Sequence, residues 1–408
     1  MKMNSKQIRK RALLLVAAML IITSASTRLS ADTGMCGGAT ITLPFTDVPA
    51  GNIFFCSIAE AFFSGLTNGT TATTYSPGDP VPREQMAAFV TRTMDQSVKR
   101  AGKRAALDQF WTAQTDKNLG LTFLGGFSNP QHVKSDGSDL WVAGVGNGGT
   151  VSRVRASDGK LLETWTGATG AYYPLVAMGK VFVVGAVTAQ GKLYQIDPTQ
   201  PPGLVDTVTN VGLAPTSIAF DGQRIWVANN GGSISIVTLN PLNVTTVSAG
   251  FSQPVGIIYD GANIWVTDVD GDKFDKLDSS GNILMSVVLE SFPGFPAFDG
   301  TNFWVPNSNH NSVSVVRATG PMSATVLATL TGNGLDSPTQ AAFDGERILV
   351  TNQNGNSISL WSASDLSPIG TFSTGPGTTG AGTTPVGVCS DGMNFWVTLS
   401  TTDTLARF

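Results

Sequence analysis

The sequence predicts a mainly β protein, a seven-bladed β-propeller, with a small α-helical module before it. The first observation is a phrase, Pro-x5-Asp-Gly, followed by a large apolar residue eleven positions after the Pro. The second is its recurrence at intervals of about 40 residues, the length of one four-stranded blade. The third is that the chain ends part-way through a repeat and has a spare strand before the first one. The six clear copies begin at Pro130, Pro215, Pro254, Pro293, Pro338 and Pro385.

The copy that begins at Pro215 shows how one repeat is expected to fold. A first strand leads into Asp221-Gly222, which predicts a tight turn because Gly accepts a positive φ at no steric cost. A second strand contains Trp226, and a polar hairpin then leads to two further strands. The strands are apolar on both faces, which indicates sheets covered on both sides. The four expected strands are residues 217–220, 225–228, 233–237 and 244–247.

The spacing of the Asp residues predicts a seventh repeat. Asp136 and Asp221 are 85 residues apart, which is about twice the length of one repeat. A degenerate copy from Pro174 to Phe182 fits this interval if three residues are missing from its turn. A stack of β-solenoid turns is the structural rival, but the recurrent Asp-Gly hairpins favour the propeller.

The two ends of the repeat region predict how the ring closes. Residues 403–408 provide only the third strand of the last repeat. Residues 119–125 precede the first repeat and can supply the missing fourth strand. Pairing of the two segments would leave no exposed sheet edge. The propeller is therefore expected to occupy residues 119–408.

Residues 1–31 have the features of a secretory signal peptide. A basic start precedes an apolar run at residues 12–22, which is too short to span a bilayer comfortably. A small, polar stretch follows, with cleavage expected after Ala31, or alternatively near Ala25 or Ser26. An uncleaved anchor is the other interpretation. The protein is expected to be secreted to the bacterial cell surface or envelope, with no transmembrane span in the mature chain.

The net charge of the chain indicates which class of partner can be excluded. Removing residues 1–31 takes away six basic and no acidic residues, which leaves 19 Lys and Arg against 29 Asp and Glu, a net charge of −10. Such a surface repels phosphates, so no nucleic acid partner is expected.

Cys36 and Cys56 are close in sequence, and export would let them form a disulfide. Cys389 would remain as a buried thiol, and no two cysteines have metal-ligand spacing.

Residues 32–95 predict a compact module with two short amphipathic helices, 56–63 and 84–94, and Gly-containing loops between them. Together with the segments Phe45-Thr-Asp47-Val-Pro49 and Val81-Pro-Arg-Glu84, this region resembles the S-layer homology module. In that family the module is a helix–loop–helix unit that holds exported proteins on cell-wall polysaccharide. Residues 96–118 are expected to form a helical linker with its basic residues on a solvated face.

The resemblance implies that Asp47, Arg83 and Glu84 contribute to a pocket for cell-wall glycan. Arg suits this role because its planar guanidinium pairs with acidic, ketal-bearing sugars. The sequence departs from the family in three ways. A Pro precedes Arg83 where Thr is usual, Phe54 or Phe55 stands where Trp is common, and one copy is present where the family usually has three. A folded module that no longer binds glycan is therefore the alternative.

The later repeats resemble the YVTN family of propeller repeats and the related NHL repeats, most closely at Val266-Thr267-Asp268 and Val350-Thr351-Asn352. The resemblance implies the fold but no single function, because propellers serve as binding scaffolds, lactonases and lyases alike. The Trp residues of the repeats are expected to pack between blades rather than to stack on a ligand.

Few residues are suited to catalysis. The sequence has two histidines: His132, in a first strand, and His310, in a polar hairpin that is expected to be solvated. His132 and Gln340 occupy the same register in different repeats and are candidates to face the central channel, with a polar core role as the alternative for His132. Lyases that inactivate virginiamycin are similar in repeat style and rely on histidine and a metal, but no matching set is found in this sequence.

One acidic cluster, Asp268-Val-Asp270-Gly-Asp272, alternates carboxylates around Gly in a way that can hold calcium. It replaces the Asn-rich hairpin of other repeats, so a polar hairpin is the plainer interpretation. No other metal or cofactor is predicted.

Together these patterns predict an exported envelope protein without catalytic activity. Its module would dock to cell-wall polysaccharide or another envelope polymer, and its propeller would bind a protein or glycan ligand. The alternative is a propeller enzyme of lactonase or lyase type, with its site in the central channel.

Overall fold

The computed structural model describes residues 33–93, except 37–38, 64–66, 68, 84–85, 87–88 and 91–92, and residues 122–408, except 186–189 and 376–381. The chain divides into two compact units, Met1–Thr93 and Met94–Phe408. The predicted signal peptide (1–31) and helical linker (96–118) lie outside the described residues. Within the described part of the chain, no helix has the length and apolar character needed to cross a membrane.

The first unit contains a β-hairpin that the sequence did not predict. Strands β1 (Thr33–Cys36) and β2 (Ala39–Thr42) pair with each other, and the helix α2 (Phe55–Phe63) follows. Helix α2 corresponds to the first of the two expected helices, whereas most of the second, 84–94, lies outside the described residues. The described residues in or next to this segment, Arg83, Met86, Phe89, Val90 and Thr93, are helical, but only α2 is described along its length, so the expected helix–loop–helix unit is not shown.

A small aromatic core and a disulfide hold this unit together. Cys36 at the end of β1 is bonded to Cys56 in α2, with Cα atoms 5.5 Å apart. The ring of Phe45 lies 5.0 Å from that of Phe62 and 5.3 Å from that of Tyr75. The cross-link joins the hairpin to the helix, so both elements share one core.

The second unit is a seven-bladed propeller, as the sequence predicts. Each blade is a four-stranded antiparallel sheet in which consecutive strands are neighbours. From first to fourth strand, blade one consists of β4 (Pro130–Ser135), β5 (Asp139–Gly144), β6 (Thr150–Arg155) and β7 (Leu161–Thr166), blade two of β8 (Ala171–Ala177), β9 (Lys180–Gly185), β10 (Gln190–Ile196) and β11 (Asp206–Leu213), and blade three of β12 (Pro215–Phe220), β13 (Ile225–Asn229), β14 (Ser233–Leu239) and β15 (Leu242–Val247). Blade four consists of β16 (Pro254–Tyr259), β17 (Ile264–Asp268), β18 (Lys273–Leu277) and β19 (Ile283–Val288), and blade five of β20 (Ala297–Phe298), β21 (Asn302–Asn307), β22 (Ser312–Gly320) and β23 (Ser323–Thr331). Blade six consists of β24 (Pro338–Phe343), β25 (Arg347–Asn352), β26 (Ser357–Ser362) and β27 (Pro368–Ser373), and blade seven of β28 (Pro385–Ser390), β29 (Phe395–Leu399), β30 (Thr404–Arg407) and β3 (Thr122–Leu124).

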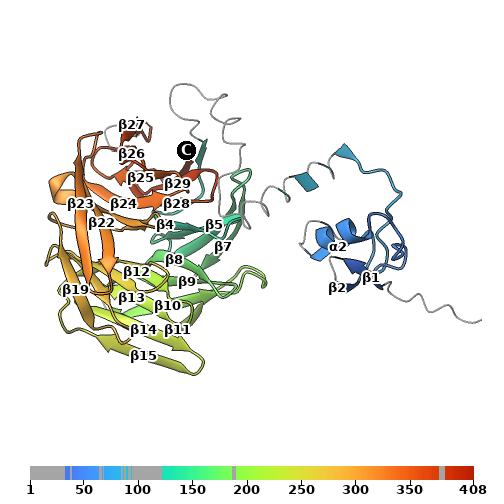
Figure 1. Ribbon diagram of the computed structural model, residues 1–408, viewed down its shortest axis with the longest axis horizontal. Coiled ribbons are helices and arrows are strands. Elements are labelled where there is room, and N and C mark those ends of the chain that lie inside the picture. Colours follow the sequence, from blue (N-terminus) through green and yellow to red (C-terminus); the bar gives the residue numbers. More distant parts are fainter. Residues whose placement is uncertain are drawn as a thin grey trace, which may run out of the picture. The chain divides into compact units, whose positions relative to one another are not determined.

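The hydrophobic core of the propeller lies between blades rather than within them. In Figure 1 first strands such as β4, β12 and β28 lie towards the middle, and fourth strands such as β15, β23 and β27 lie at the rim. Each pair of neighbouring blades shares one cluster of buried side chains. Trp226 of blade three, for example, packs with Ile257 and Val266 of blade four. The repeat tryptophans thus pack between blades, as expected.

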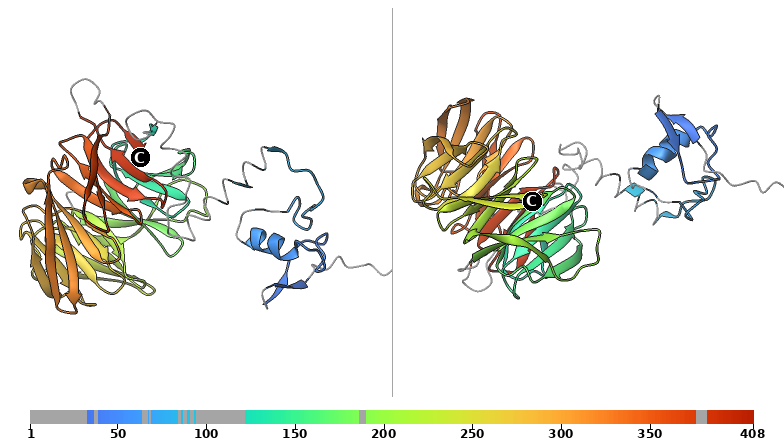
Figure 2. Two further views of the ribbon diagram at one scale, coloured as in Figure 1. Left: turned by 45° about the horizontal axis from the view of Figure 1, so that its top comes forward. Right: turned by 90° about the horizontal axis from the view of Figure 1, so that it is seen from below.

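The ring closes between blades seven and one. Strand β3 pairs with β30, with Phe123 opposite Ala406, so the segment before the first repeat completes the last blade. Figure 2 shows β3, in teal, beside the C-terminal strand. The hydroxyl of Thr398 in blade seven also donates to the backbone oxygen of Gln131 in blade one, at 2.5 Å. The predicted closure by residues 119–125 is confirmed for the part that the structure describes.

The Asp-Gly turn of each repeat is held by the Asp side chain. In blade four, one carboxylate oxygen (Oδ1) of Asp260 accepts the backbone N–H groups of Ala262 and Asn263, at 2.8 and 2.6 Å. Gly261 follows with a φ of 96°, a conformation that favours glycine. The same arrangement recurs in the other five Asp-Gly turns, so the motif fixes the hairpin between the first and second strands.

The second carboxylate oxygen (Oδ2) of the Asp binds the Trp of the following strand. In five blades the indole Nε1–H donates to it, and we call this hydrogen bond the Asp–Trp clamp. It ties the turn to the side chain that fills the space between blades. The five donor–acceptor distances are 3.1 Å for Trp141–Asp136, 2.7 Å for Trp226–Asp221, 2.8 Å for Trp265–Asp260, 2.8 Å for Trp304–Asp299 and 2.6 Å for Trp396–Asp391.

Blades two and six replace the clamp. In blade six Leu349 stands in the Trp position, and the Asp344 carboxylate instead pairs with Arg347 at 3.0 Å. In blade two Ala177 and Phe182 stand in the Asp and Trp positions. Blade two therefore lacks both the carboxylate acceptor and the indole donor of the clamp, so neither group is left without its partner.

The prediction that the second repeat begins at Pro174 is wrong. Strand β8 begins at Ala171, which pairs with Gly185 as Pro215 pairs with Asn229 in blade three. Phe182 then lies eleven residues after Ala171, the standard spacing. No residues are missing from the turn, and the Pro of the repeat is simply replaced by Ala.

We expect Asp260→Ala and Trp265→Phe to be energetically coupled. Either change alone leaves the other partner of a buried hydrogen bond unpaired, so the second change costs less once the first is made. Urea unfolding of both single variants and the double variant should give an interaction free energy of about 1–2 kcal/mol. As a control, Asp260→Ala combined with Trp361→Phe, a buried Trp of blade six, should be additive. Additivity in the clamp pair would contradict the proposed role of the clamp.

We also expect strand β3 to be essential for ring closure. A chain that begins at Met94 keeps this strand, whereas one that begins at Gly126 lacks it and exposes the edge of β30. The shorter chain should unfold at a lower urea concentration, by about 2 kcal/mol or more for the lost hydrogen bonds. It should also aggregate in a concentration-dependent way, because an open edge can pair with another chain. Equal stability and equal sedimentation of the two chains would show that β3 does not close the ring.

Candidate functional site

Side chains of non-neighbouring blades meet at the axis of the propeller. His132 of blade one lies 2.8 Å from Gln340 of blade six, measured from Nδ1 to Oε1. The amide nitrogen (Nε2) of Gln340 donates in turn to the hydroxyl of Tyr173 in blade two, at 3.1 Å. All three residues occupy the same register of their first strands, two positions after the residue that begins the strand. Contacts between blades one, two and six require that these side chains cross the middle of the ring.

Aromatic rings complete this axial cluster. The ring of Phe295 in blade five lies 4.6 Å from the His132 ring and 5.6 Å from the Tyr173 ring. His132 is 0% exposed and Gln340 is 1% exposed. The sequence suggested both residues as candidates to face the channel. The structure brings them together at the axis, where they close this layer of the channel instead of lining an open one.

The hydrogen bonds of the axial cluster define the tautomer of His132. Because the Gln340 amide nitrogen is the donor to Tyr173, its Oε1 atom is the acceptor and the Nδ1 atom of His132 carries the proton. Burial lowers the pKa of His132 to about 3, and the nearby Lys134 ammonium acts in the same direction. His132 is therefore neutral near pH 7. Its Nε2 lone pair is buried and has no hydrogen-bond partner in the described part of the chain.

Two further groups near the axis are unsuited to nucleophilic chemistry. Burial raises the pKa of the Cys389 thiol, so this cysteine stays protonated. Burial alone would lower the pKa of Lys134, but its interaction with the hydroxyl of Tyr173 raises it, so Lys134 stays charged. Its Nζ atom lies 5.1 Å from the centre of the Tyr173 ring. A charged ammonium has no lone pair with which to act as a base or nucleophile.

The acidic hairpin of blade four is built as a loop support. Asp268 is 0% exposed, and its two carboxylate oxygens accept the backbone N–H groups of Ser252 and Gln253 at 2.7 and 2.8 Å. Asp272 accepts the backbone N–H of Phe292 at 3.0 Å. Among the described residues, no three His, Cys, Asp or Glu side chains gather so that they could hold a metal ion. The calcium candidates Asp268, Asp270 and Asp272 thus have no metal-binding geometry to support them.

His310 lies apart from the axis, on an exposed hairpin. Its Nδ1 atom is 2.7 Å from the Glu290 carboxylate, and the His310 side chain is 55% exposed. The two histidines are therefore not brought together.

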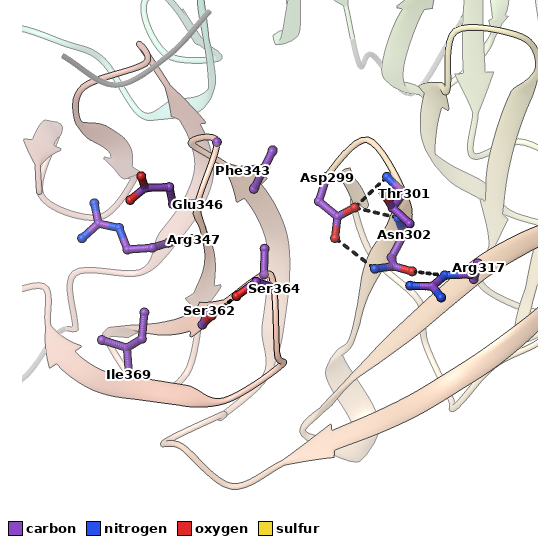
Figure 3. Close-up of a pocket in the computed structure, with 12 residues that line it drawn as sticks. Asp299, Thr301, Asn302, Arg317, Phe343, Glu346, Arg347, Ser362, Ser364 and Ile369 are labelled. Carbon is purple, nitrogen blue, oxygen red and sulfur yellow. Dashed lines mark hydrogen bonds between the residues drawn. The ribbon is translucent and has the colours of Figure 1, made fainter.

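An open crevice lies between blades five and six, next to their Asp-Gly turns. Its volume is about 610 Å³. In Figure 3 Arg317, Asn302 and Asp299 form one wall, and Phe343, Ser362 and Ser364 lie across from them. Glu346, Arg347 and Ile369 also line the crevice, and the charged ends of Glu346 and Arg347 point away from Arg317 in Figure 3. The crevice therefore offers charged, neutral polar and apolar groups to one ligand.

The equivalent crevice between blades three and four is largely filled. Its volume is about 210 Å³. Arg224 stands three residues after Asp221, pairs with that Asp at 2.9 Å and reaches across to the backbone oxygen of Ser279 in the next blade. Blade five has Asn302 at this position, and its shorter side chain does not span the gap. Arg224 thus fills the crevice between blades three and four, whereas Asn302 leaves the one between blades five and six open.

In the first unit, the predicted glycan-binding residues have different environments. The Asp47 carboxylate accepts the backbone N–H groups of Tyr75 and Ser76 at 2.8 and 2.7 Å, and these bonds hold its pKa below the usual range against the effect of burial. Arg83 is exposed. Glu84 lies outside the described residues. Asp47 thus shapes a loop, and Arg83 is available to a ligand.

Comparisons with known proteins identify the fold only. No family model matches the chain, and no curated protein matches it. Among solved structures, a streptogramin B lyase is 16% identical, with a TM-score of 0.56 over 70% of this chain and 96% of the lyase. Virginiamycin B lyase from Staphylococcus aureus is 18% identical, with a TM-score of 0.57 over 70% of this chain and 98% of that one.

A third structure, the β-propeller domain of Cps50 (Swd1) from Myceliophteria thermophila, is 10% identical, with a TM-score of 0.58 over 71% of this chain and 99% of that domain. The fold is a seven-bladed β-propeller. At these identities the likeness shows the fold alone, and two lyases and Cps50 share it to a similar degree.

The buried His132 predicts a specific pH dependence of stability. The unfolded chain takes up a proton on this side chain below about pH 6.5, whereas the folded protein does so only near pH 3. The free energy of unfolding should therefore fall as the pH is lowered between these values, by on the order of 2 kcal/mol at pH 4.5. We expect His132→Phe to remove this component.

The test is urea unfolding at pH 7 and pH 4.5 for wild type and His132→Phe, with His310→Phe as the matched control. Parallel pH dependence of wild type and His132→Phe would show that His132 is not held neutral.

Proposed function

We propose that this protein is a non-catalytic binding protein of the bacterial cell envelope. Its first unit docks to cell-wall polysaccharide or another envelope polymer, and its propeller binds a glycan. One observation carries the second part of this proposal: polar side chains line an open crevice at the Asp-Gly turns, while the axis is closed by packed side chains. Small-molecule sites are generally concave, preformed and supplied with a few fixed polar groups.

The scaffold suits binding because its geometry is fixed. The Asp–Trp clamps, the shared inter-blade clusters and the closure by β3 hold neighbouring blades in register. A crevice whose walls come from two such blades changes little in shape on binding. Less conformational entropy is then lost when the ligand is bound.

Docking of the first unit rests on Arg83. Its guanidinium is exposed and offers a planar fork of donors to an acidic sugar. The Asp47 carboxylate already accepts two backbone N–H groups, so we assign to it a supporting role in the shape of the loop.

A lyase-type enzyme is the second candidate function, favoured by the likeness of fold to the two streptogramin lyases. The surroundings of His132 argue against a catalytic centre at the axis. Its free nitrogen is enclosed by Tyr172, Tyr173 and Phe295 and is reached by no opening that the structure shows. Cleavage of a streptogramin B antibiotic by the purified protein, abolished by His132→Ala, would establish this second function.

We expect Arg83→Ala to lower retention of the protein on purified cell-wall polysaccharide about tenfold. Loss of a charge-assisted hydrogen-bond pair costs about 1.5–3 kcal/mol, which corresponds to such a change. Arg155→Ala, which removes a partly exposed arginine from blade one, is the control and should bind as wild type does. The measurement is a pull-down with quantified supernatant. Equal retention of wild type and Arg83→Ala would rule out Arg83 as a glycan contact.

A further inference from the structure

We propose that the crevice between blades five and six binds an acidic sugar, a hexuronate, with its carboxylate on Arg317. This inference rests on the proposed function of the propeller as a glycan-binding scaffold, and it names the ligand class and the residue that selects it.

Arg317 is held in place by one nitrogen and leaves the others available. Its Nε atom donates to the side-chain oxygen of Asn302, at 2.8 Å. Asn302 is 5% exposed, and its backbone N–H and side-chain amide both donate to Asp299, so the anchor of Arg317 is itself fixed. The two terminal nitrogens of Arg317 have no hydrogen-bond partner in the described part of the chain. A guanidinium oriented in this way presents two parallel donors, which match the two oxygens of a carboxylate.

The neighbouring Asp299 does not cancel this preference. Its carboxylate accepts hydrogen bonds from the backbone N–H groups of Thr301 and Asn302, from the Asn302 amide and from the Trp304 indole. Four donors thus stabilise its negative charge within the turn. On the opposite wall, Arg347 pairs with Asp344 and lies over the ring of Phe395. The free donors of Arg317 are therefore those best placed for an anion.

The facing wall suits the rest of a sugar ring. The hydroxyls of Ser362 and Ser364 lie 3.1 Å apart and can each exchange hydrogen bonds with ring hydroxyls. Phe343 and Ile369, the latter 48% exposed, provide apolar surface for the carbon–hydrogen face of the ring. A volume of about 610 Å³ falls within the range of small-molecule sites, about 300–1,000 Å³.

A monocarboxylate fits this crevice better than a phosphate does. One oriented guanidinium supplies two donors, whereas a phosphate dianion carries three acceptor oxygens and calls for more positive charge. The Asp299 carboxylate in the same crevice would repel a dianion more strongly than a single negative charge. The charge balance of the crevice therefore favours a sugar acid with one carboxylate per ring.

The test is isothermal titration calorimetry of the purified full chain with digalacturonate, with galactobiose as the uncharged probe and inorganic phosphate as the anion without a sugar. We expect saturable binding of digalacturonate, at least tenfold tighter than that of galactobiose or phosphate. Arg317→Gln should weaken digalacturonate binding at least tenfold and leave the weak binding of galactobiose unchanged. Arg224→Gln, at the equivalent filled crevice, is the matched control and should bind as wild type does. Urea midpoints of the variants verify that each is folded.

Absence of digalacturonate binding by wild type, tighter binding of phosphate or galactobiose, or unchanged binding by Arg317→Gln would each overturn the proposal. These outcomes are distinguishable from failure of the proposed function. If the chain is retained on cell-wall polymer through Arg83 but binds no digalacturonate, the ligand class is wrong and the docking role stands. If digalacturonate binds through Arg317 but no polymer is retained, the docking role fails and the crevice site stands.

Discussion

The hydrogen bond from a Trp indole to the Asp of the preceding turn is the interaction on which the propeller depends most. One Asp side chain does two tasks: Oδ1 closes the turn between the first and second strands, and Oδ2 fixes the indole that fills the space to the next blade. In blade three, burial alone would raise the pKa of Asp221, but hydrogen bonds from Trp226 and from the backbone N–H groups of Arg224 and Gln223 hold it below the usual range. Local turn chemistry and long-range packing are thus set by one residue.

Because the clamp fixes the frame, differences between repeats appear in the space that the frame leaves. At the axis, Ser217 of blade three has larger counterparts in four other blades. These are His132, Tyr173, Phe295 and Gln340, and their side chains fill the axis of the propeller. At the Asp-Gly turns, Arg224 fills the crevice between blades three and four, whereas the shorter Asn302 leaves the crevice between blades five and six open. The repeat therefore explains the scaffold, and its exceptions produce both the closed axis and the open crevice.

Much of the architecture could be predicted from the sequence. The spacing from Pro to Asp to Trp identified the blades because it matches the hairpin formed by the first two strands of each blade. The last repeat lacked a fourth strand, which implied closure by residues near 122. The start of the second blade was predicted wrongly because Pro174 was taken for the Pro that begins each repeat. Only Ala171 has the standard spacing of eleven residues to Phe182. The β1–β2 hairpin was missed because its strands have four residues each, too few for a clear alternation of apolar and polar residues.

The sites were harder to predict, because they depend on contacts between distant repeats. Sequence register placed His132 and Gln340 in equivalent positions, but only the structure shows that they meet and close the axis. Arg317 carried no signal of its own, since it lies in a third strand outside the repeated phrase. The position of Asn302 did not mark the crevice either, because Asn also stands there in blades four and seven, as Asn263 and Asn394. Whether a side chain spans the gap between two blades depends on the width of that gap, which the sequence does not give.

The most direct test of this account is a crystal structure of the protein grown with digalacturonate. The account predicts electron density for the sugar in the crevice between blades five and six, with a carboxylate on the terminal nitrogens of Arg317 and with His132 still bonded to Gln340 at a closed axis. Sugar density at the axis beside His132, or in another inter-blade crevice with that of Arg317 empty, would contradict it.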